Sequence, residues 1–190
     1  MGERPVFLDF EASSLADGSY PIEVGWVFAD GTSEAHLIRP ARDWTDWDPR
    51  AERIHRITRE ELVANGTPYH QVASRMVEVL TGEDVCASAP SWDGKWLSVL
   101  LRTAGYPRGT LRLRDSDDVF AEAARAILGP VVASEGLESA VGQVLALDEL
   151  RRRAGPPAHR ALPDAQEERQ RWLDVREAAG RMAERLAARV

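Results

Sequence analysis

The chain has 190 residues, and its 24 basic against 31 acidic side chains give a net charge of −7. Such a length suits one compact domain with a real core, so we expect a single domain over residues 1–190. The acidic balance excludes a global positive field for gripping long nucleic acid, and it argues against a sequence-specific duplex binder.

The cysteine content and the apolar segments bear on the compartment. Cys86 is the single cysteine, which excludes an intramolecular disulfide and a zinc cluster made of thiolates. No apolar segment approaches membrane-spanning length, and no basic-then-apolar leader opens the sequence. We therefore expect a cytoplasmic protein without membrane contact.

The spacing of apolar residues predicts alternating strands and helices, and therefore an α/β fold with a mixed sheet flanked by helices. Strands are expected over residues 6–10, 22–28, 34–38, 85–87 and 111–113. The second and third must pair antiparallel, because only the turn at residues 29–32 joins them. An irregular excursion with short helical pieces is expected over residues 40–65. Helices are expected over residues 68–80, 93–104, 117–128 and 135–153, and from about residue 163 into the C-terminus.

Two carboxylates mark the first expected strand. The run from Val6 to Phe10 is apolar except for Asp9, and Glu11 follows it. Because side chains alternate along a strand, Asp9 and Glu11 point to the same face. Carboxylates held side by side repel each other unless a cation lies between them, and such hard oxygen ligands suit Mg²⁺ or Mn²⁺. The sequence therefore predicts half of a metal site at its beginning.

Other candidate residues each have an ordinary structural explanation. Asp93 precedes an apolar helical pattern and is suited to cap that helix. Asp164 follows Pro163 at a helix start, where an acidic residue complements the helix dipole. A lone histidine in a proline-bounded loop, such as His159, is more often solvated than catalytic, and His55 is expected to anchor a loop by hydrogen bonds.

The order of these residues along the chain carries more information than any one of them. Asp9-x-Glu11 lies on the first strand, Asp93 opens a middle helix, and His159-x-x-x-x-Asp164 enters the last helix. This arrangement resembles the DEDD superfamily of 3′–5′ exonucleases in its histidine variant, DEDDh, which includes RNase T, oligoribonuclease and polymerase proofreading subunits.

Three further segments support the resemblance, which spans a core from about residue 5 to residue 175, before the C-terminal helix that runs to residue 190. Residues 21–27 resemble the family's second strand, and residues 159–165 resemble its third motif. Residues 53–58 resemble its I-H-G-I-T segment, with Arg56 in place of the glycine. The first motif departs from the family, because Ala12-Ser13-Ser14-Leu15 stands where Thr-Thr-Gly-Leu is usual.

The resemblance implies a ribonuclease-H-like three-layer fold around a mixed five-stranded sheet. It also implies a 3′–5′ exonuclease that acts on single-stranded or short RNA or DNA and releases nucleoside 5′-monophosphates. Relatives such as RNase T and oligoribonuclease work as dimers, so a homodimer is one expectation for this chain. The Ala12 and Ser13 amides would meet the 3′-terminal nucleotide, and Leu15 holds the family's wedge position beside its base.

The chemistry of phosphodiester hydrolysis fits the same residues. Two metal ions about 3.5–4 Å apart activate the attacking water and relieve charge on the leaving oxygen. We expect Asp9 to bridge two Mg²⁺ or Mn²⁺ ions, with Glu11 and Asp164 completing one site and Asp93 holding the other. His159 would act as the general base. Trp92 or Trp96 would offer a stacking platform for bases.

Three alternatives stay open. One is a non-catalytic or weakly active module on the same fold that binds nucleotides or nucleic acid. The second is an endonuclease for RNA–DNA hybrids, against which the His-x-x-x-x-Asp pattern argues. The third is a protein-interaction role for the C-terminal helix, whose arginines alternate with alanine and leucine at Arg171, Arg176, Arg181, Arg185 and Arg189.

Overall fold

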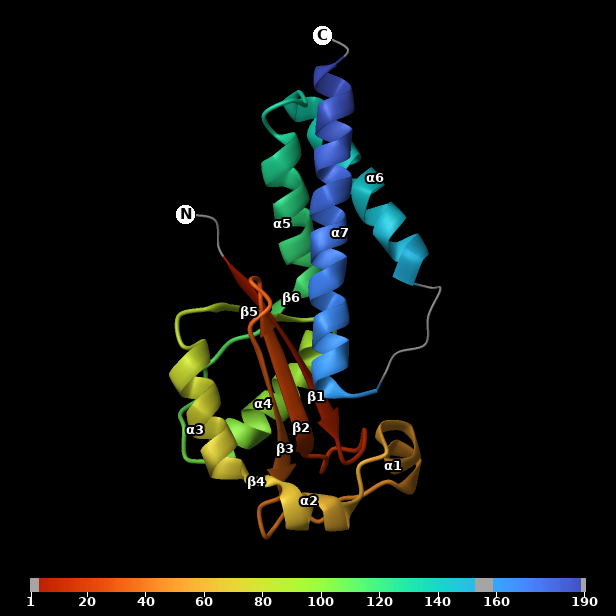
Figure 1. Cartoon of the computed structure of the whole chain (residues 1–190). Coiled ribbons are helices and arrows are strands. Elements are labelled where there is room, and N and C mark those ends of the chain that lie inside the picture. Colours follow the sequence, from red (N-terminus) through yellow and green to blue (C-terminus); the bar gives the residue numbers. More distant parts are fainter. Residues whose placement is uncertain (1–3, 153–158, 189–190) are drawn as a thin grey trace.

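The computed structural model of the chain describes residues 4–152 and 159–188. A mixed sheet of six strands, in the order β4-β3-β2-β1-β5-β6, is flanked by helices (Figure 1). The strands are β1 (Pro5–Ala12), β2 (Pro21–Phe28), β3 (Ser33–Arg39), β4 (Thr67–Pro68), β5 (Asp84–Ala87) and β6 (Arg114–Asp115). The helices are α1 (Pro49–His55), α2 (Arg59–Asn65), α3 (Tyr69–Leu80), α4 (Pro90–Thr103), α5 (Ser116–Leu128), α6 (Ser134–Arg152) and α7 (Ala161–Ala187).

The sheet begins as an antiparallel meander and continues with parallel strands. β1 pairs antiparallel with β2, and β2 pairs antiparallel with β3, as the short turn between them predicted. β5 pairs parallel with β1 and with β6. A parallel strand requires a crossover, and α3 and α4 provide crossovers here. The α/β fold with a mixed sheet is confirmed.

Two details of the expected sheet are wrong. The sheet has six strands and not five, because Thr67–Pro68 pairs with the end of β3 as β4. The last strand lies at Arg114–Asp115 and not at residues 111–113. Leu111 and Leu113 instead pack against the core beside α4, so their apolar character reflects side-chain burial and not strand pairing.

The two faces of β1 support two separate cores. Val6, Leu8 and Phe10 point into the core shared with α3 and α4. Phe7 points into the core of α5, α6 and α7. Because side chains alternate, Asp9 and Glu11 lie on the Phe7 face, toward α7.

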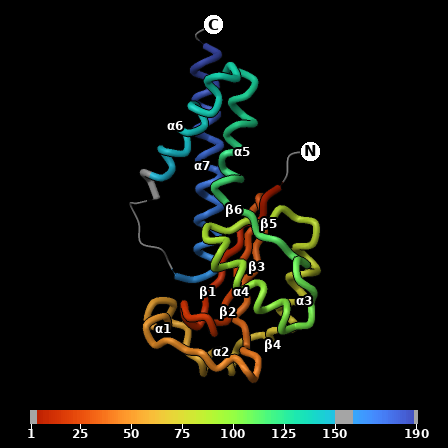
Figure 2. Tube along the Cα trace, turned by 180° about the vertical axis from the view of Figure 1, so that it is seen from behind, coloured from red at the N-terminus to blue at the C-terminus, as the bar shows by residue number. Residues whose placement is uncertain are grey.

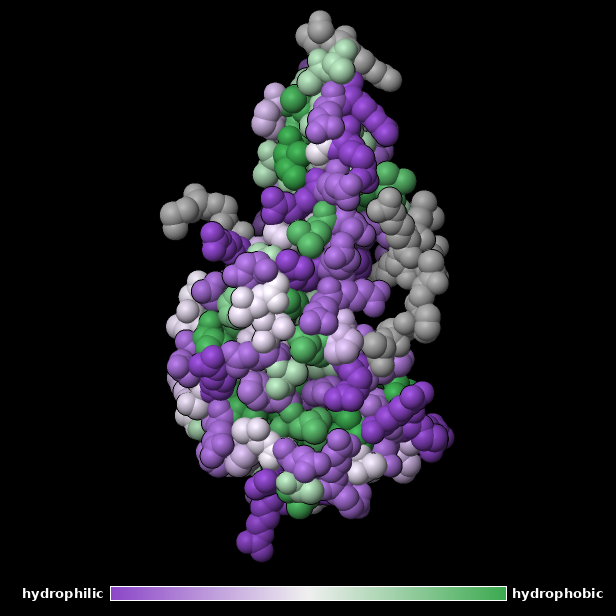
Figure 3. Space-filling model, viewed as in Figure 1, coloured by the Kyte–Doolittle hydropathy of each residue, from purple (hydrophilic) through white to green (hydrophobic). Residues whose placement is uncertain are grey.

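The last three helices pack together and extend beyond the sheet. Figures 1 and 2 show α7 crossing the sheet with its first turns and continuing past it beside α5 and α6. The buried Arg171 of α7 pairs with Glu168 one turn earlier and with Asp148 of α6, so this bundle has a buried ionic link. The face of α7 seen in Figure 3 is mainly hydrophilic, as expected for a solvated helix.

The helix boundaries differ slightly from those expected. α4 begins at Pro90, three residues before Asp93, and α7 begins at Ala161, two residues before Pro163. α6 is described as far as Arg152, so the expected final residue, Arg153, lies outside the described residues. Within the described part of the chain, no helix is long and apolar enough to cross a membrane.

Candidate metal centre

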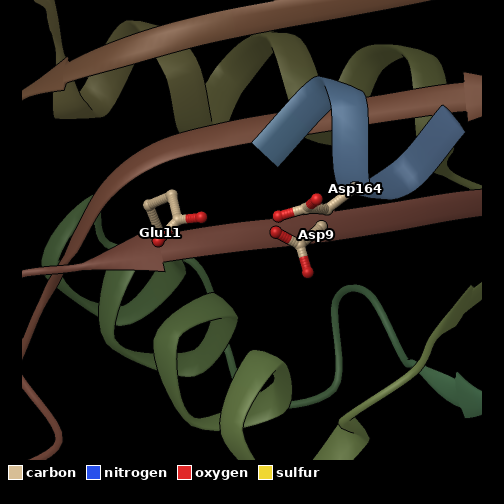
Figure 4. Close-up of side chains that lie close together, drawn as sticks. All are labelled: Asp9, Glu11 and Asp164. Atoms are coloured by element: carbon tan, nitrogen blue, oxygen red, sulfur yellow. The ribbon is translucent and has the colours of Figure 1, made fainter. Parts of the chain in front are cut away.

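Three of the expected metal ligands meet at one end of the sheet. Each of Asp9, Glu11 and Asp164 offers a carboxylate oxygen, and these oxygens all lie within 4.8 Å of one another. Figure 4 shows the Asp9 and Asp164 carboxylates facing each other, with Glu11 farther along β1. Residues separated by more than 150 positions are thus brought together by the packing of α7 on β1.

A glycine makes this packing geometrically feasible. Gly25 of β2 lies opposite Asp9 in the β1–β2 ladder. A Cβ atom on Gly25 would lie 2.4 Å from the backbone nitrogen of Leu162, in the first turn of α7. Real Cβ atoms essentially never approach other atoms so closely, so α7 reaches the sheet because this position carries no side chain.

Asp164 also has a structural role at the start of α7. Its Oδ2 accepts a hydrogen bond from the backbone N–H of Arg160, at 3.2 Å. An acid in the first turn of a helix satisfies such an N–H group and complements the helix dipole. The structural explanation offered from the sequence therefore holds, and it coexists with the position of Asp164 beside Asp9 and Glu11.

The electrostatics of this cluster favour a bound cation. Burial, followed by the negative charges of Asp93 and Glu11, raises the pKa of Asp9 well above its usual range. Burial and the charge of Asp164 raise the pKa of Glu11 to about 8. A divalent cation would offset this mutual repulsion, and a set of carboxylate oxygens suits Mg²⁺ or Mn²⁺. The residues present therefore fit such an ion.

Asp93 lies beside the three carboxylates without being one of the group. Its Oδ1 accepts a hydrogen bond from the backbone N–H of Phe10 in β1, at 3.2 Å. Burial raises its pKa to about 7, although that hydrogen bond opposes the shift. Asp93 is not the N-cap residue of α4, because Ala89 holds that position, but it is an acid of the first turn, as Asp164 is in α7. Asp93 also joins the start of α4 to β1.

A buried ion pair that the sequence patterns did not predict lies next to the cluster. Glu23 lies opposite Glu11 in the β1–β2 ladder and is 4% exposed. Arg160 donates hydrogen bonds from Nη2 to Glu23 Oε1 at 2.6 Å and from Nε to Oε2 at 3.0 Å. The backbone N–H of Ala161 donates to the same carboxylate at 2.9 Å. The available signal was an acid within an otherwise apolar strand, since a buried charge requires a partner.

His159 directly precedes this arginine. It is exposed, and its backbone lies in the left-handed region with φ of 54°. Within residues 4–152 and 159–188, no hydrogen bond joins it to the three carboxylates. Pro156 and Pro157, which precede His159 in the sequence, lie outside the described residues. The general-base role of His159 remains a prediction.

The turn that follows β1 is held in place on two sides. Asp46 accepts hydrogen bonds from the hydroxyls of Ser13 and Ser14, at 3.1 and 2.5 Å. On the other side, Lys95 of α4 donates to the carbonyl oxygen of Ala16 at 2.6 Å. The Ser13 N–H donates to the Tyr20 carbonyl oxygen, so the nucleotide contact predicted for this amide would require that bond to break.

Two apolar side chains stand out near this turn. Leu15 at its tip is 68% exposed, and Trp92 in the first turn of α4 is 38% exposed. Trp96 is buried and stacks against Trp92, while its Nε1 donates to Ser19. Of the two tryptophans expected to stack on bases, only Trp92 therefore has an accessible ring.

The segment around His55 shows why a glycine is usual there. Nδ1 of the buried His55 accepts a hydrogen bond from the Ile57 N–H at 3.1 Å, as expected for a loop anchor. The next residue, Arg56, ends α1 in the left-handed conformation with φ of 60°. Glycine adopts that conformation without steric cost, whereas arginine does not.

Comparisons with known proteins show similarity in three dimensions. No family model matches the sequence, and no curated protein matches it either. The zinc-bound complex of Escherichia coli exonuclease I with single-stranded DNA matches with a TM-score of 0.61 and 19% identity, over 90% of this chain and 39% of that chain. Apo exonuclease I matches with a TM-score of 0.63 and 17% identity, over 97% and 44%. The E. coli enzyme with a dA16 oligonucleotide matches with a TM-score of 0.62 and 18% identity, over 96% and 42%.

These matches establish the fold. The chain has the ribonuclease-H-like architecture of exonuclease I over most of its length, as the resemblance of its motifs implied. It spans less than half of the length of the exonuclease I chains.

Proposed function

We propose that residues 1–190 form a metal-dependent 3′–5′ exonuclease domain that shortens single-stranded or short nucleic acid and releases nucleoside 5′-monophosphates. One observation supports this most directly: the carboxylates of Asp9, Glu11 and Asp164 gather on the fold of exonuclease I. The raised pKa values of Asp9 and Glu11 indicate a site that is electrostatically incomplete without a cation.

The metal would be held by the chain's acidic residues. Asp9, Glu11 and Asp164 would bind Mg²⁺ or Mn²⁺ directly, and Asp93 would contribute to a second ion from the start of α4. Such ions lower the pKa of bound water and stabilise charge on the transferred phosphoryl group. Asp9 is affected by the charges of Asp93, Glu11 and Asp164, so it would be the acid that serves both ions.

Protein groups would supply the remaining functions. His159 would accept the proton of the attacking water, a task suited to an imidazole near neutral pH. Arg160 pairs with Glu23, and its charge opposes the rise in the pKa of Glu11, which favours the ionised form that a metal requires. Leu15 and Trp92 would contact the terminal bases, and one stacked base contributes about 1–3 kcal/mol.

Single-stranded DNA is the first substrate to test, because it is bound in the similar E. coli exonuclease I complexes. A 5′-labelled oligonucleotide incubated with Mn²⁺ should shorten from its 3′ end one nucleotide at a time, and EDTA should stop the reaction. A 3′-phosphate should block it, and a circular single strand should resist it. Cleavage within the circle would favour an endonuclease.

Asp9→Asn provides the matched inactive protein. Because Asp9 is proposed to bind both ions, we expect this variant to lose nearly all activity. Full activity of this variant, or of the unchanged protein in excess EDTA, would contradict the proposal.

The second candidate, a binding module without activity, is favoured by the engaged Ser13 N–H and by Ala12 in the first motif. It predicts oligonucleotide binding without any shortening.

A further inference from the structure

A groove lies along one side of α4, apart from the three carboxylates of the candidate metal centre. It has a volume of about 570 Å³ and lies between α4 and the segment of residues 107–113 that leads toward β6. Its apolar lining comes from leucines of both segments, including Leu97 and Leu101 of α4 and Leu111 of the following loop. These leucines also pack against the core, so the floor of the groove is part of the folded domain.

The charged side chains that line the groove are all arginines. They are Arg102 at the end of α4, and Arg108 and Arg112 in the loop, all of them exposed. Among residues 4–152 and 159–188, no carboxylate lines the groove. Within the described residues none of the three is in an ion pair, and Arg102 Nε donates a hydrogen bond to the Ser98 carbonyl oxygen of its own helix. In a chain with a net charge of −7, three unpaired arginines along one groove form a local site for anions.

The groove and the candidate metal centre share the start of α4. Pro90 and Gly94 line one end of it, and Asp93 and Trp92 belong to the same turn of α4. From Pro90 to Arg102 the helix rises by about 18 Å, at about 1.5 Å per residue. A strand whose 3′ end lay at Asp9 and Asp93 would have to pass the first turn of α4 to enter the groove, and Arg102 lies at the other end of that helix.

We propose that this groove binds the phosphodiester backbone of a single nucleic-acid strand, upstream of the 3′-terminal nucleotide. The inference rests on the proposed function for the position of the 3′ end, and it adds a surface that grips the strand beyond the reacting bond. Arginine guanidinium groups pair with phosphates, and the leucine floor accommodates sugars and bases. Because three arginines serve the groove in a protein that is acidic elsewhere, its grip should be local and strongly dependent on salt.

Salt dependence measures this grip without any need for hydrolysis. We would follow fluorescence anisotropy of a labelled oligothymidylate of about 12 nucleotides in EDTA, at several salt concentrations between about 50 and 200 mM. For single strands, the logarithm of the binding constant falls by about 0.7 per contacted phosphate for each tenfold rise in salt. Three arginines therefore predict a slope of about −2 for the unchanged protein.

Two variants test the assignment independently. The double variant Arg108→Gln/Arg112→Gln should reduce the slope to about −0.7 and weaken binding at low salt. Ser98→Glu places a carboxylate in the groove, four residues before Arg102. A Glu and an Arg at this spacing favour helix formation, so the variant should fold. It should bind the strand several-fold more weakly, because the new carboxylate repels phosphates. The control, Arg181→Gln/Arg185→Gln, removes the same charge far along α7 and should leave the slope unchanged.

The outcomes separate this inference from the proposed function. An unchanged slope in the groove variant, or an equal loss in the control, would overturn the groove assignment. Hydrolysis of a dinucleotide, which is too short to reach the arginines, should be the same in the unchanged protein and in the groove variant. If no dinucleotide or oligonucleotide is hydrolysed while the groove variant still flattens the slope, the proposed function fails and the groove assignment stands.

Discussion

Gly25 lies directly opposite Asp9 in the β1–β2 ladder, and the first turn of α7 packs against it. This relationship explains how Asp164 arrives beside Asp9. Any side chain at position 25 would occupy the space of the α7 backbone, because the Leu162 nitrogen would be 2.4 Å from its Cβ.

Gly25→Ala should therefore displace α7 from the sheet and separate Asp164 from Asp9. We expect a loss of stability of about 1–3 kcal/mol, as in other overpacked cores, together with a large loss of Mn²⁺ affinity. Gly180→Ala, on the same helix but with open space around it, should instead stabilise the protein by about 1 kcal/mol. Urea denaturation and calorimetry measure both effects, and a Gly25→Ala protein with unchanged metal affinity would contradict this explanation.

The metal-free protein should lose stability as pH rises through the range set by Glu11. Its carboxyl has a pKa of about 8 in the folded protein against 4.5 ordinarily, so the folded state binds the proton more tightly. Stability from this group is present at low pH and is lost between about pH 4.5 and 8, by a few kcal/mol. His55 acts in the opposite direction, because burial lowers its pKa and its protonation favours unfolding.

A comparison with Glu11→Gln isolates the contribution of Glu11, since glutamine does not titrate. In EDTA, the free energy of unfolding of the variant should fall less steeply between pH 5 and 8 than that of the unchanged protein. Saturating Mn²⁺ should remove most of the decline in the unchanged protein. Parallel pH profiles for the two proteins would show that Glu11 has no raised pKa.

His159 should matter for the rate of hydrolysis and little for metal binding. General-base assistance contributes about 10²–10⁴-fold, so His159→Ala should lower turnover within that range near neutral pH. Higher pH should restore part of the loss, because hydroxide then replaces the missing base. The Mn²⁺ dissociation constant from calorimetry should hardly change. Loss of metal binding would make His159 a ligand or a structural anchor, and unchanged turnover would make it a bystander.

Arg171 should be the most sensitive charged residue of the helical bundle. Its guanidinium pairs with the buried carboxylates of Glu168 and Asp148, at 2.8 and 2.7 Å. Arg171→Met leaves both acids without their partner, and breaking such a buried pair costs about 3–5 kcal/mol. Arg181→Met removes an exposed pair with Glu177 and should cost at most about 0.5 kcal/mol. Equal thermal stability of the two variants would contradict a structural role for the buried link.

Arg56→Gly should stabilise the protein. The left-handed backbone at this position costs about 1–2 kcal/mol for a residue with a side chain, and glycine avoids this cost. Part of the gain is lost again, because glycine has more conformational entropy in the unfolded state. We expect a net gain of about 1 kcal/mol, which for a protein of this size raises the melting temperature by about 2–4 °C. Arg53→Gly, inside α1, should destabilise by a similar amount. A lower melting temperature for Arg56→Gly would show that the arginine side chain makes a compensating contact.

The local patterns that the sequence carries predicted most of the elements correctly. The strands from β1 to β3 follow from alternating or continuous apolar residues, and helices α3 to α6 follow from apolar faces of helical period. The failures are short elements: β4 and β6 have two residues each, too few for a periodic signal. Leu111 and Leu113 misled the assignment because an apolar residue reports burial and not hydrogen-bond partners.

The sequence by itself determined which residue types are available for chemistry, since Asp9 and Glu11 must share a face of a strand whatever the rest of the chain does. Only the tertiary structure decided which acids meet. It brought Asp164 to Asp9 across Gly25, turned Asp93 toward the Phe10 N–H, and paired Glu23 with Arg160. The physical reason is that repulsion between carboxylates and burial of charge depend on distances between elements, and local sequence patterns do not contain those distances.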